Sequence, residues 1–125
     1  MNNTTKKHFK LFKQEGKKWQ KRLGLMEWEI MFTHLEEEEE ETVGSRGTCF
    51  AVADLGSAII NLNTKWPEFD IVTHYQIRKT AFHEMCELLM WPLRVLLLVY
   101  FSDGVVRYKI HSILRRMENA FYEEE

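Results

Sequence analysis

The residues best suited to chemistry lie in the stretch TAFHEMCELL, where His83 is followed directly by Glu84 and, four positions after His83, by Glu87. On a helix, residues four apart lie over one another on the same face, so the His83 imidazole and the Glu87 carboxylate can converge on one ion. Glu84 lies one step around the helix and can reach a molecule bound to that ion without being a ligand. The stretch therefore indicates a candidate metal site with a carboxylate beside it.

The spacing is that of the H-E-x-x-H zinc motif, with Glu87 at the position of the second histidine. Zinc accepts carboxylate oxygen as well as imidazole nitrogen, so this exchange is chemically permitted. Three interpretations are open: a metal site with one ligand exchanged, a site that no longer binds metal, and an ordinary amphipathic helix that contains His-Glu. The pattern H-E-x-x-E does not decide among them, since Glu87 can equally be a surface carboxylate.

A catalytic zinc site needs a third protein ligand and an open position for water. The remaining histidines are His8, His34, His74 and His111. His111 is the best placed, because it lies on the next long predicted helix and a turn at residues 102–104 would return that helix across His83. The predicted metal ligands are therefore His83, Glu87 and His111. The alternative is that His111 is a histidine of the core or its boundary.

The first two thirds of the chain predict one helix and three strands. Residues 5–22 place Phe9, Phe12, Gly16 and Trp19 near one helical face, and Gly24 is suited to end that helix. Alternation with period two then predicts strands in MEWEIMFTHL, GTCFAVADL and SAIINLNTKW. Together these segments predict a small three-stranded, mainly antiparallel sheet.

The period becomes helical from Thr73 onward. The apolar stripe of this helix contains Ile77, Phe82, Met85, Leu88 and Leu89. Pro92 is expected to end or kink the helix, and Ser102-Asp103-Gly104 offers a turn and a cap for a final helix. The apolar side of that final helix contains Val106, Ile110, Ile113, Leu114, Met117 and Phe121. Residues 1–125 are thus predicted to form one α+β domain with an N-terminal helix, the sheet and two long C-terminal helices.

Six consecutive glutamates, Glu36 to Glu41, lie between the first two predicted strands. Like charges at this density repel one another and favour a solvated loop. We expect a flexible connection, with attraction of a cation or a basic partner as the functional alternative.

Composition narrows the classes of function. The chain has 125 residues, a hydrophobic fraction of 45% and a formal net charge of −2, which gives no general attraction to nucleic acid or anionic lipid. Two cysteines are too few for a disulfide framework, and the first residues contain no apolar signal segment. The most apolar run, residues 88–101, is shorter than the roughly 20 residues that a membrane span requires. We therefore expect a cytoplasmic protein with no membrane segment.

The order of the predicted elements resembles that of the SprT-like zinc peptidases. A first helix leads to LGLMEWEIMF, a strand pair ends in AIINLN, and a helix opens with TAFHEMCELL. The family has an L-G-W-type strand, an I-x-L-N strand and then T-x-x-H-E-x-x-H. The resemblance extends to small phage-encoded proteins that end in a helix like IHSILRRMENAFY, and it covers roughly residues 8 to 121. The chain departs from the family at Glu87, where the family has its second histidine.

The resemblance implies a zincin-like fold and a zinc-dependent metallopeptidase. Such an enzyme would act on a protein or peptide substrate and hydrolyse its peptide bonds through a zinc-activated water. Zn²⁺ would be held by His83, Glu87 and His111, with Glu84 as the general base. An electrophile for the oxyanion is also needed, and the candidates are Arg107, Tyr108 and Arg115. Two imidazoles and one carboxylate also suit Fe(II) or Mn(II).

Two other functions are weighed against hydrolysis. The first is a catalytically inactive zincin-like protein of a phage that captures a host or phage protein in the host cytoplasm. The second is nucleic-acid binding through the lysine-rich first helix, which the absence of a basic excess disfavours.

Overall fold

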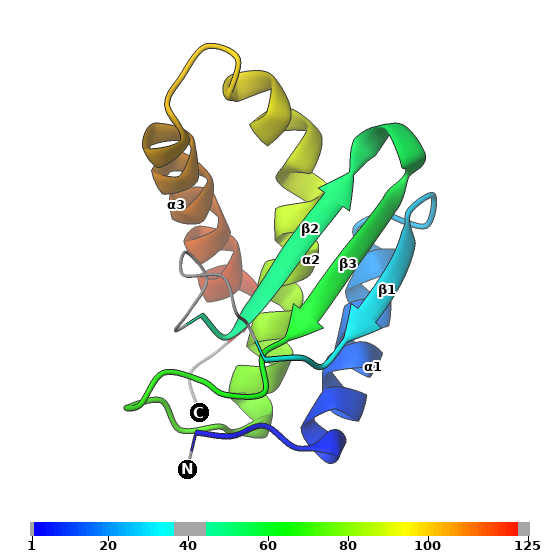
Figure 1. Ribbon diagram of the computed structural model, residues 1–125, viewed down its shortest axis with the longest axis vertical. Coiled ribbons are helices and arrows are strands. Elements are labelled where there is room, and N and C mark those ends of the chain that lie inside the picture. The colour runs from blue at the N-terminus through cyan, green and yellow to red at the C-terminus, as the bar shows by residue number, and fades with distance from the viewer. Residues whose placement is uncertain (1, 37–44, 123–125) are drawn as a thin grey trace.

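The computed structural model describes residues 2–36 and 45–122, which form an α+β fold of three helices and one three-stranded sheet. The elements are α1 (Lys6–Arg22), β1 (Glu29–Thr33), β2 (Gly47–Val52), the short 3₁₀ helix η1 (Ala53–Leu55), β3 (Ser57–Leu62), α2 (His74–Leu97) and α3 (Asp103–Phe121) (Figure 1). The predicted fold class and order of elements are confirmed. Of the predicted glutamate connection, Glu36 is exposed and residues 37–41 lie outside the described residues.

The sheet is mixed. Strand β3 lies in the middle, with β1 parallel to it on one side and β2 antiparallel on the other. The β2–β3 hairpin passes through η1 and Gly56, whose φ of 63° is readily adopted by glycine. A mainly antiparallel sheet was expected, yet one of the two strand pairings is parallel. Alternation within a strand shows which side chains face the core, but it does not show which strand becomes the neighbour.

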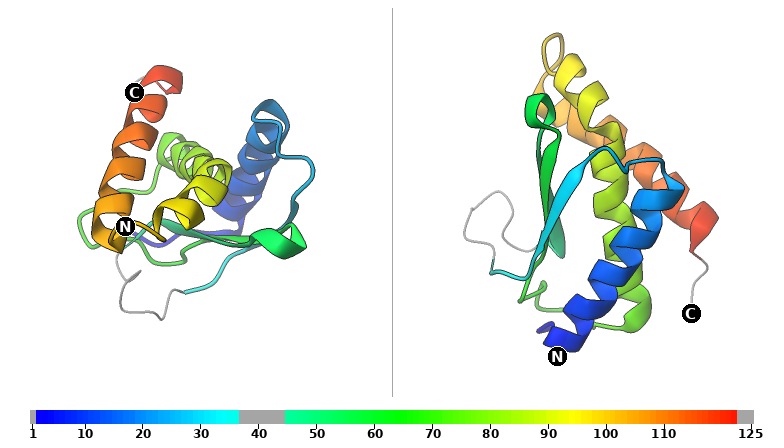
Figure 2. Two further views of the ribbon diagram at one scale, coloured as in Figure 1. Left: turned by 90° about the horizontal axis from the view of Figure 1, so that it is seen from above. Right: turned by 90° about the vertical axis from the view of Figure 1, so that its right-hand side faces the viewer.

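Helices α1 and α2 cover one face of the sheet, and α3 lies beside α2 (Figure 2). The core between the sheet and these helices contains side chains with no exposed surface, among them Phe12, Ile60, Leu62, Phe82 and Met85. Helix α2 therefore packs on the sheet with one side and faces α3 with another.

The helices begin where their capping residues predict. Thr5, Thr73 and Ser102 are the N-caps of α1, α2 and α3, and each side-chain oxygen accepts an N–H from the first turn of its helix. Helix α2 does not end at Pro92 but continues to Leu97. Pro92 lies at an exposed position of α2. No helix within residues 2–36 and 45–122 is both long and apolar enough to cross a membrane.

The predicted apolar stripes are largely buried. On α2, Ile77, Phe82, Met85 and Leu88 have no exposed surface, whereas Leu89 is 37% exposed. On α3, Val106, Ile110 and Leu114 are buried, while Ile113 and Phe121 are exposed. The stripe of α3 is narrower than predicted because this helix packs on α2 and leaves its remaining surface to solvent.

Candidate metal centre

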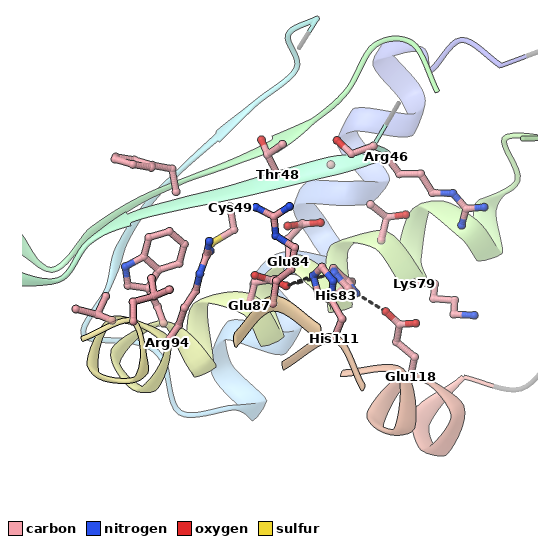
Figure 3. Close-up of a pocket in the computed structure, with 18 residues that line it drawn as sticks. Arg46, Thr48, Cys49, Lys79, His83, Glu84, Glu87, Arg94, His111 and Glu118 are labelled. Carbon is pink, nitrogen blue, oxygen red and sulfur yellow. Dashed lines mark hydrogen bonds and ion pairs between the residues drawn. The ribbon is translucent and has the colours of Figure 1, made fainter. Parts of the chain in front are cut away.

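The three predicted ligands come together where α2 faces α3. His83 and Glu87 lie on α2 and His111 on α3, and one ligand atom of each lies within 4.8 Å of the others (Figure 3). His111 Nε2 is 2.8 Å from Glu87 Oε1, and His83 Nε2 is 3.6 Å from the same oxygen. This group could hold a metal ion.

The packing of α3 explains the position of His111. Val106, Ile110 and Leu114 recur every four residues and are buried, so they form the side of α3 that packs inward. His111 follows Ile110 and therefore lies at the border of this packed side. From there its side chain reaches Glu87, one helical turn beyond His83.

The other histidines lie close to residues of the N-terminal segment or to one another. His34 Nε2 lies 2.7 Å from the hydroxyl of Thr4, and the rings of His8 and His74 are 6.1 Å apart. Thr4 donates its hydroxyl proton to the carbonyl of Asn63, so the Nε2–H of His34 is the donor to Thr4. The choice of His111 among the histidines therefore agrees with the geometry.

Glu118 is a member of the site that the sequence analysis missed. Its Oε1 accepts a hydrogen bond from His83 Nδ1 at 2.5 Å. A proton held on Nδ1 leaves Nε2 as the ligand atom, and this nitrogen is the one nearer to Glu87. Histidine ligands of metals commonly have such a partner, which fixes the tautomer and the orientation of the ring. The signal in the sequence is the seven-residue spacing of His111 and Glu118, about two helical turns.

The charges of the group are strongly coupled. Burial disfavours protonation of His83, but its hydrogen bonds to Glu118 and Glu87 outweigh burial and raise its pKa to about 10. Burial also works to raise the pKa of Glu87, whereas hydrogen bonds from His111 and His83 lower it to about 2. Without a metal the group is therefore an ion-paired cluster. A divalent cation would replace the protons, since metal ligands bind in their deprotonated forms.

Glu84 lies beside this group and is only 6% exposed. Burial raises its pKa to about 7. The positive charge of His83 lowers this pKa, and the negative charge of Glu87 raises it. A carboxyl group with a pKa near neutrality can both take up and release a proton, as a general base must.

The site opens into a cleft of about 850 Å³ between β2 and the two C-terminal helices (Figure 3). One wall is residues 47–50 of β2, which is one of the two edge strands of the described sheet. The apolar end of the cleft is formed by Phe50, Trp91, Val95 and Leu98. Arg46 and Lys79 line the opposite end of the cleft, beyond His83. The candidate ligands thus lie partway along an open groove.

The cleft also narrows the choice of electrophile. Of the three candidates, Arg107 lines the cleft, whereas Tyr108 and Arg115 do not. Arg94, which the sequence analysis did not single out, lines it too.

Cys49 of β2 also lines the cleft. Burial raises the pKa of the Cys49 thiol, the charges of Glu84 and Glu87 raise it further, and Arg94 opposes the rise. Cys49 is therefore a neutral thiol in the wall of the cleft.

The donor set fits a small divalent cation. Ligand atoms 2.0–2.1 Å from a tetrahedral zinc ion are about 3.3 Å apart, and the two separations measured to Glu87 Oε1 are 2.8 and 3.6 Å. All three ligand atoms lie within 4.8 Å of one another, so the side chains would have to draw closer together around an ion, and three protein ligands leave one position open. No family model, curated protein or solved structure matches the chain. The site must therefore be interpreted from its own chemistry.

Proposed function

We propose that the protein is a zinc-dependent metallopeptidase that hydrolyses peptide bonds in a protein or peptide substrate. The observation that carries this proposal is the convergence of His83, Glu87 and His111 beside the buried carboxyl of Glu84, in an open cleft. Imidazole and carboxylate donors with an open position are typical of catalytic zinc sites. The resemblance to SprT-like peptidases in the order of elements is a second, weaker support.

Each residue has a defined role in the proposed reaction. His83, Glu87 and His111 bind the metal, and Glu118 orients His83. When bound, zinc would lower the pKa of water toward about 7 and polarise the substrate carbonyl. Glu84 takes the proton of the attacking water and passes it to the leaving amine.

The edge strand suits a peptide substrate. β2 forms the rim of the cleft, and an edge strand offers unpaired backbone groups to an extended chain. A peptide that lies along this rim would pass over the candidate ligands. The donors also suit Fe(II) or Mn(II), but zinc is preferred because it needs only four ligands.

The second candidate function is a metal-free, zincin-like protein that captures a host or phage protein. One observation favours it: Glu87 with His111, and Glu118 with His83, form pairs that satisfy one another without a metal. In that case the cluster joins α2 to α3 as a partly buried ion-pair network.

Metal analysis combined with one variant tests the proposal. Protein purified without a metal-affinity column should contain stoichiometric zinc and cleave flexible peptides. Glu84→Gln should keep the zinc and lose hydrolysis, because it removes the base and no ligand. Protein that remains free of metal in zinc-replete buffer would reject the peptidase and favour the binding protein.

A further inference from the structure

Two arginines border the cleft at the end nearer the α2–α3 connection. Arg94 lies on α2 and Arg107 on α3, and both line the main cleft. They also line a smaller pit of about 40 Å³ with Glu87, Ile110 and His111. The two guanidinium groups therefore lie next to the candidate metal ligands.

The positive charge of this pair is only partly neutralised. Arg94 Nη2 is 3.5 Å from one carboxylate oxygen of Asp103, and Arg107 Nη2 is 2.9 Å from the other. Asp103 is thus shared by two cations, and its side chain is 53% exposed. A guanidinium has five N–H donors, whereas these two ion pairs use one nitrogen of each arginine. One unit of positive charge and several donors remain for a ligand.

Arg46, toward the other end of the cleft, is engaged differently. Its Nε donates to Asp70 at 2.8 Å and its Nη1 to Gln76 at 2.6 Å, and its guanidinium lies over the ring of Trp66. Arg46 therefore has its own carboxylate, unlike the Arg94–Arg107 pair. This difference points to a structural role for Arg46 and a binding role for the pair.

Arg94 is also held in position. Its guanidinium lies over the ring of Trp91 at 5.1 Å, and its side chain is only 25% exposed. Its charge acts on Cys49 across the cleft, where it opposes the effect of the carboxylates. A planar guanidinium held against an aromatic ring is well suited to bind a carboxylate through two hydrogen bonds.

We propose that the Arg94–Arg107 pair binds a carboxylate of the peptide that occupies the cleft. This inference rests on the proposed peptidase function and gives it a substrate preference. Arg94 lies two helical turns beyond Glu87, about 10 Å along the axis, and its side chain reaches back to the pit beside Glu87 and His111. An extended peptide advances about 3.3 Å per residue. The recognised carboxylate therefore belongs to a residue about one to three positions from the cleaved bond, and it is either an acidic side chain or the C-terminal carboxylate.

Binding of fluorescent peptides to the zinc-loaded Glu84→Gln protein tests this without requiring turnover. Three peptides of one sequence distinguish the sources: glutamate with an amidated C-terminus, glutamine with an amidated C-terminus, and glutamine with a free C-terminus. Fluorescence anisotropy should show about tenfold tighter binding of one carboxylate-bearing peptide than of the neutral peptide. Preference for the first identifies an acidic side chain, and preference for the third identifies the C-terminus. Equal affinity for all three overturns the inference.

Variants of the two arginines locate the effect. Arg94→Gln and Arg107→Gln should each reduce the preference for the carboxylate, and Arg107, which is 48% exposed, can be replaced with little risk to folding. Arg115→Gln is the matched control, because this exposed arginine of α3 does not line the cleft. A preference that persists in both cleft variants overturns the inference. Failure of the protein to bind zinc is a separate result, seen by metal analysis, and it rejects the peptidase itself.

Discussion

His83 Nδ1 and Glu118 Oε1 lie 2.5 Å apart, although the two residues are 35 positions apart in the chain and belong to different helices. The contact places a proton on Nδ1 and leaves Nε2 to face Glu87 and His111. Because His111 and Glu118 are both on α3, this helix supplies one candidate ligand and also orients another. The geometry of the site therefore depends on the packing of α3 against α2.

Replacing Glu118 should weaken metal binding without removing a ligand. Glu118→Gln retains a hydrogen-bond acceptor but loses the charge, and Glu118→Ala loses both. We expect zinc affinity to fall by about 10–100-fold, with alanine the more severe change, as is usual for partners of histidine ligands. Competition with a chromophoric chelator measures this affinity.

An exposed glutamate provides the control for Glu118. Glu27 lies on the surface before β1, and Glu27→Gln makes the same change in net charge. Zinc affinity that is equal in the Glu118 and Glu27 variants would show that the contact with His83 does not support the metal.

At Gly47, the first residue of β2, the chain packs so closely on its neighbours that adding a single methyl group should lower stability. A Cβ atom at Gly47 would lie 2.9 Å from the carbonyl oxygen of Asn61, 3.2 Å from Thr80 Cγ2 and 3.4 Å from Glu84 Cγ. Gly47→Ala should lower the free energy of unfolding by about 1–3 kcal/mol, the usual cost of overpacking. Denaturant titration measures the loss. Gly104→Ala is the control, because a Cβ there meets no atom within 4 Å, and a loss of equal size in both variants would contradict this account.

The fold was largely predictable because each element carries a strong local signal. The change from period two to a helical period near Thr73 marks the start of α2, and Thr73 is its N-cap. Pairing of strands has no comparable local signal. Whether β1 lies beside β2 or β3 depends on the course of the whole chain, so the parallel β1–β3 pairing was not anticipated.

The candidate ligands were predictable for a similar reason. His83 and Glu87 are one helical turn apart, and His111 was the histidine on the next helix. Glu118 and Arg94 were missed because their roles depend on the side chains that face them across the α2–α3 interface. The bond between His83 and Glu118, for example, joins residues 35 positions apart on two different helices.

A buried carboxylate on α1 should make stability depend on acid. Tyr122 donates to Glu15 Oε2 at 2.5 Å and Lys18 Nζ lies 2.8 Å from the same oxygen. Burial opposes ionisation of Glu15, but hydrogen bonds from Lys18, Tyr122 and Trp19 outweigh it and lower the pKa below the ordinary 4.5. The contact therefore adds stability above about pH 4.5, and this contribution is lost as the pH falls through the lower pKa of the folded state.

Glu15→Gln should accordingly reduce the fall in unfolding free energy on the acid side of pH 4.5. Denaturant titrations at a series of pH values measure this slope. Glu29→Gln, at an exposed position of β1, is the control. If the two variants and the unmodified protein lose stability in parallel, Glu15 does not have the lowered pKa.

The last prediction addresses whether Glu87 is a metal ligand or only an ion-pair partner of His111. His83→Ala, Glu87→Ala and His111→Ala should each lower the zinc content sharply if all three are ligands. Loss of zinc alone is ambiguous, however, because removing Glu87 also breaks the 2.8 Å contact with His111. Glu87→His separates the two roles. It removes the carboxylate that accepts from His111, but it supplies another zinc donor at the same helical offset.

Two measurements on Glu87→His test the two roles in turn: stability without metal reports the ion pair with His111, and the response to zinc reports metal binding. Without metal, this variant should be less stable than the unmodified protein, because His111 loses its anionic partner and an imidazole takes the place of the carboxylate. With zinc, it should retain or exceed the affinity of the unmodified protein, and its melting temperature should rise with zinc concentration as expected for a ligand that binds the folded state. If zinc leaves the melting temperature of both proteins unchanged, Glu87 is an ion-pair partner and the cluster joins α2 to α3 without a metal.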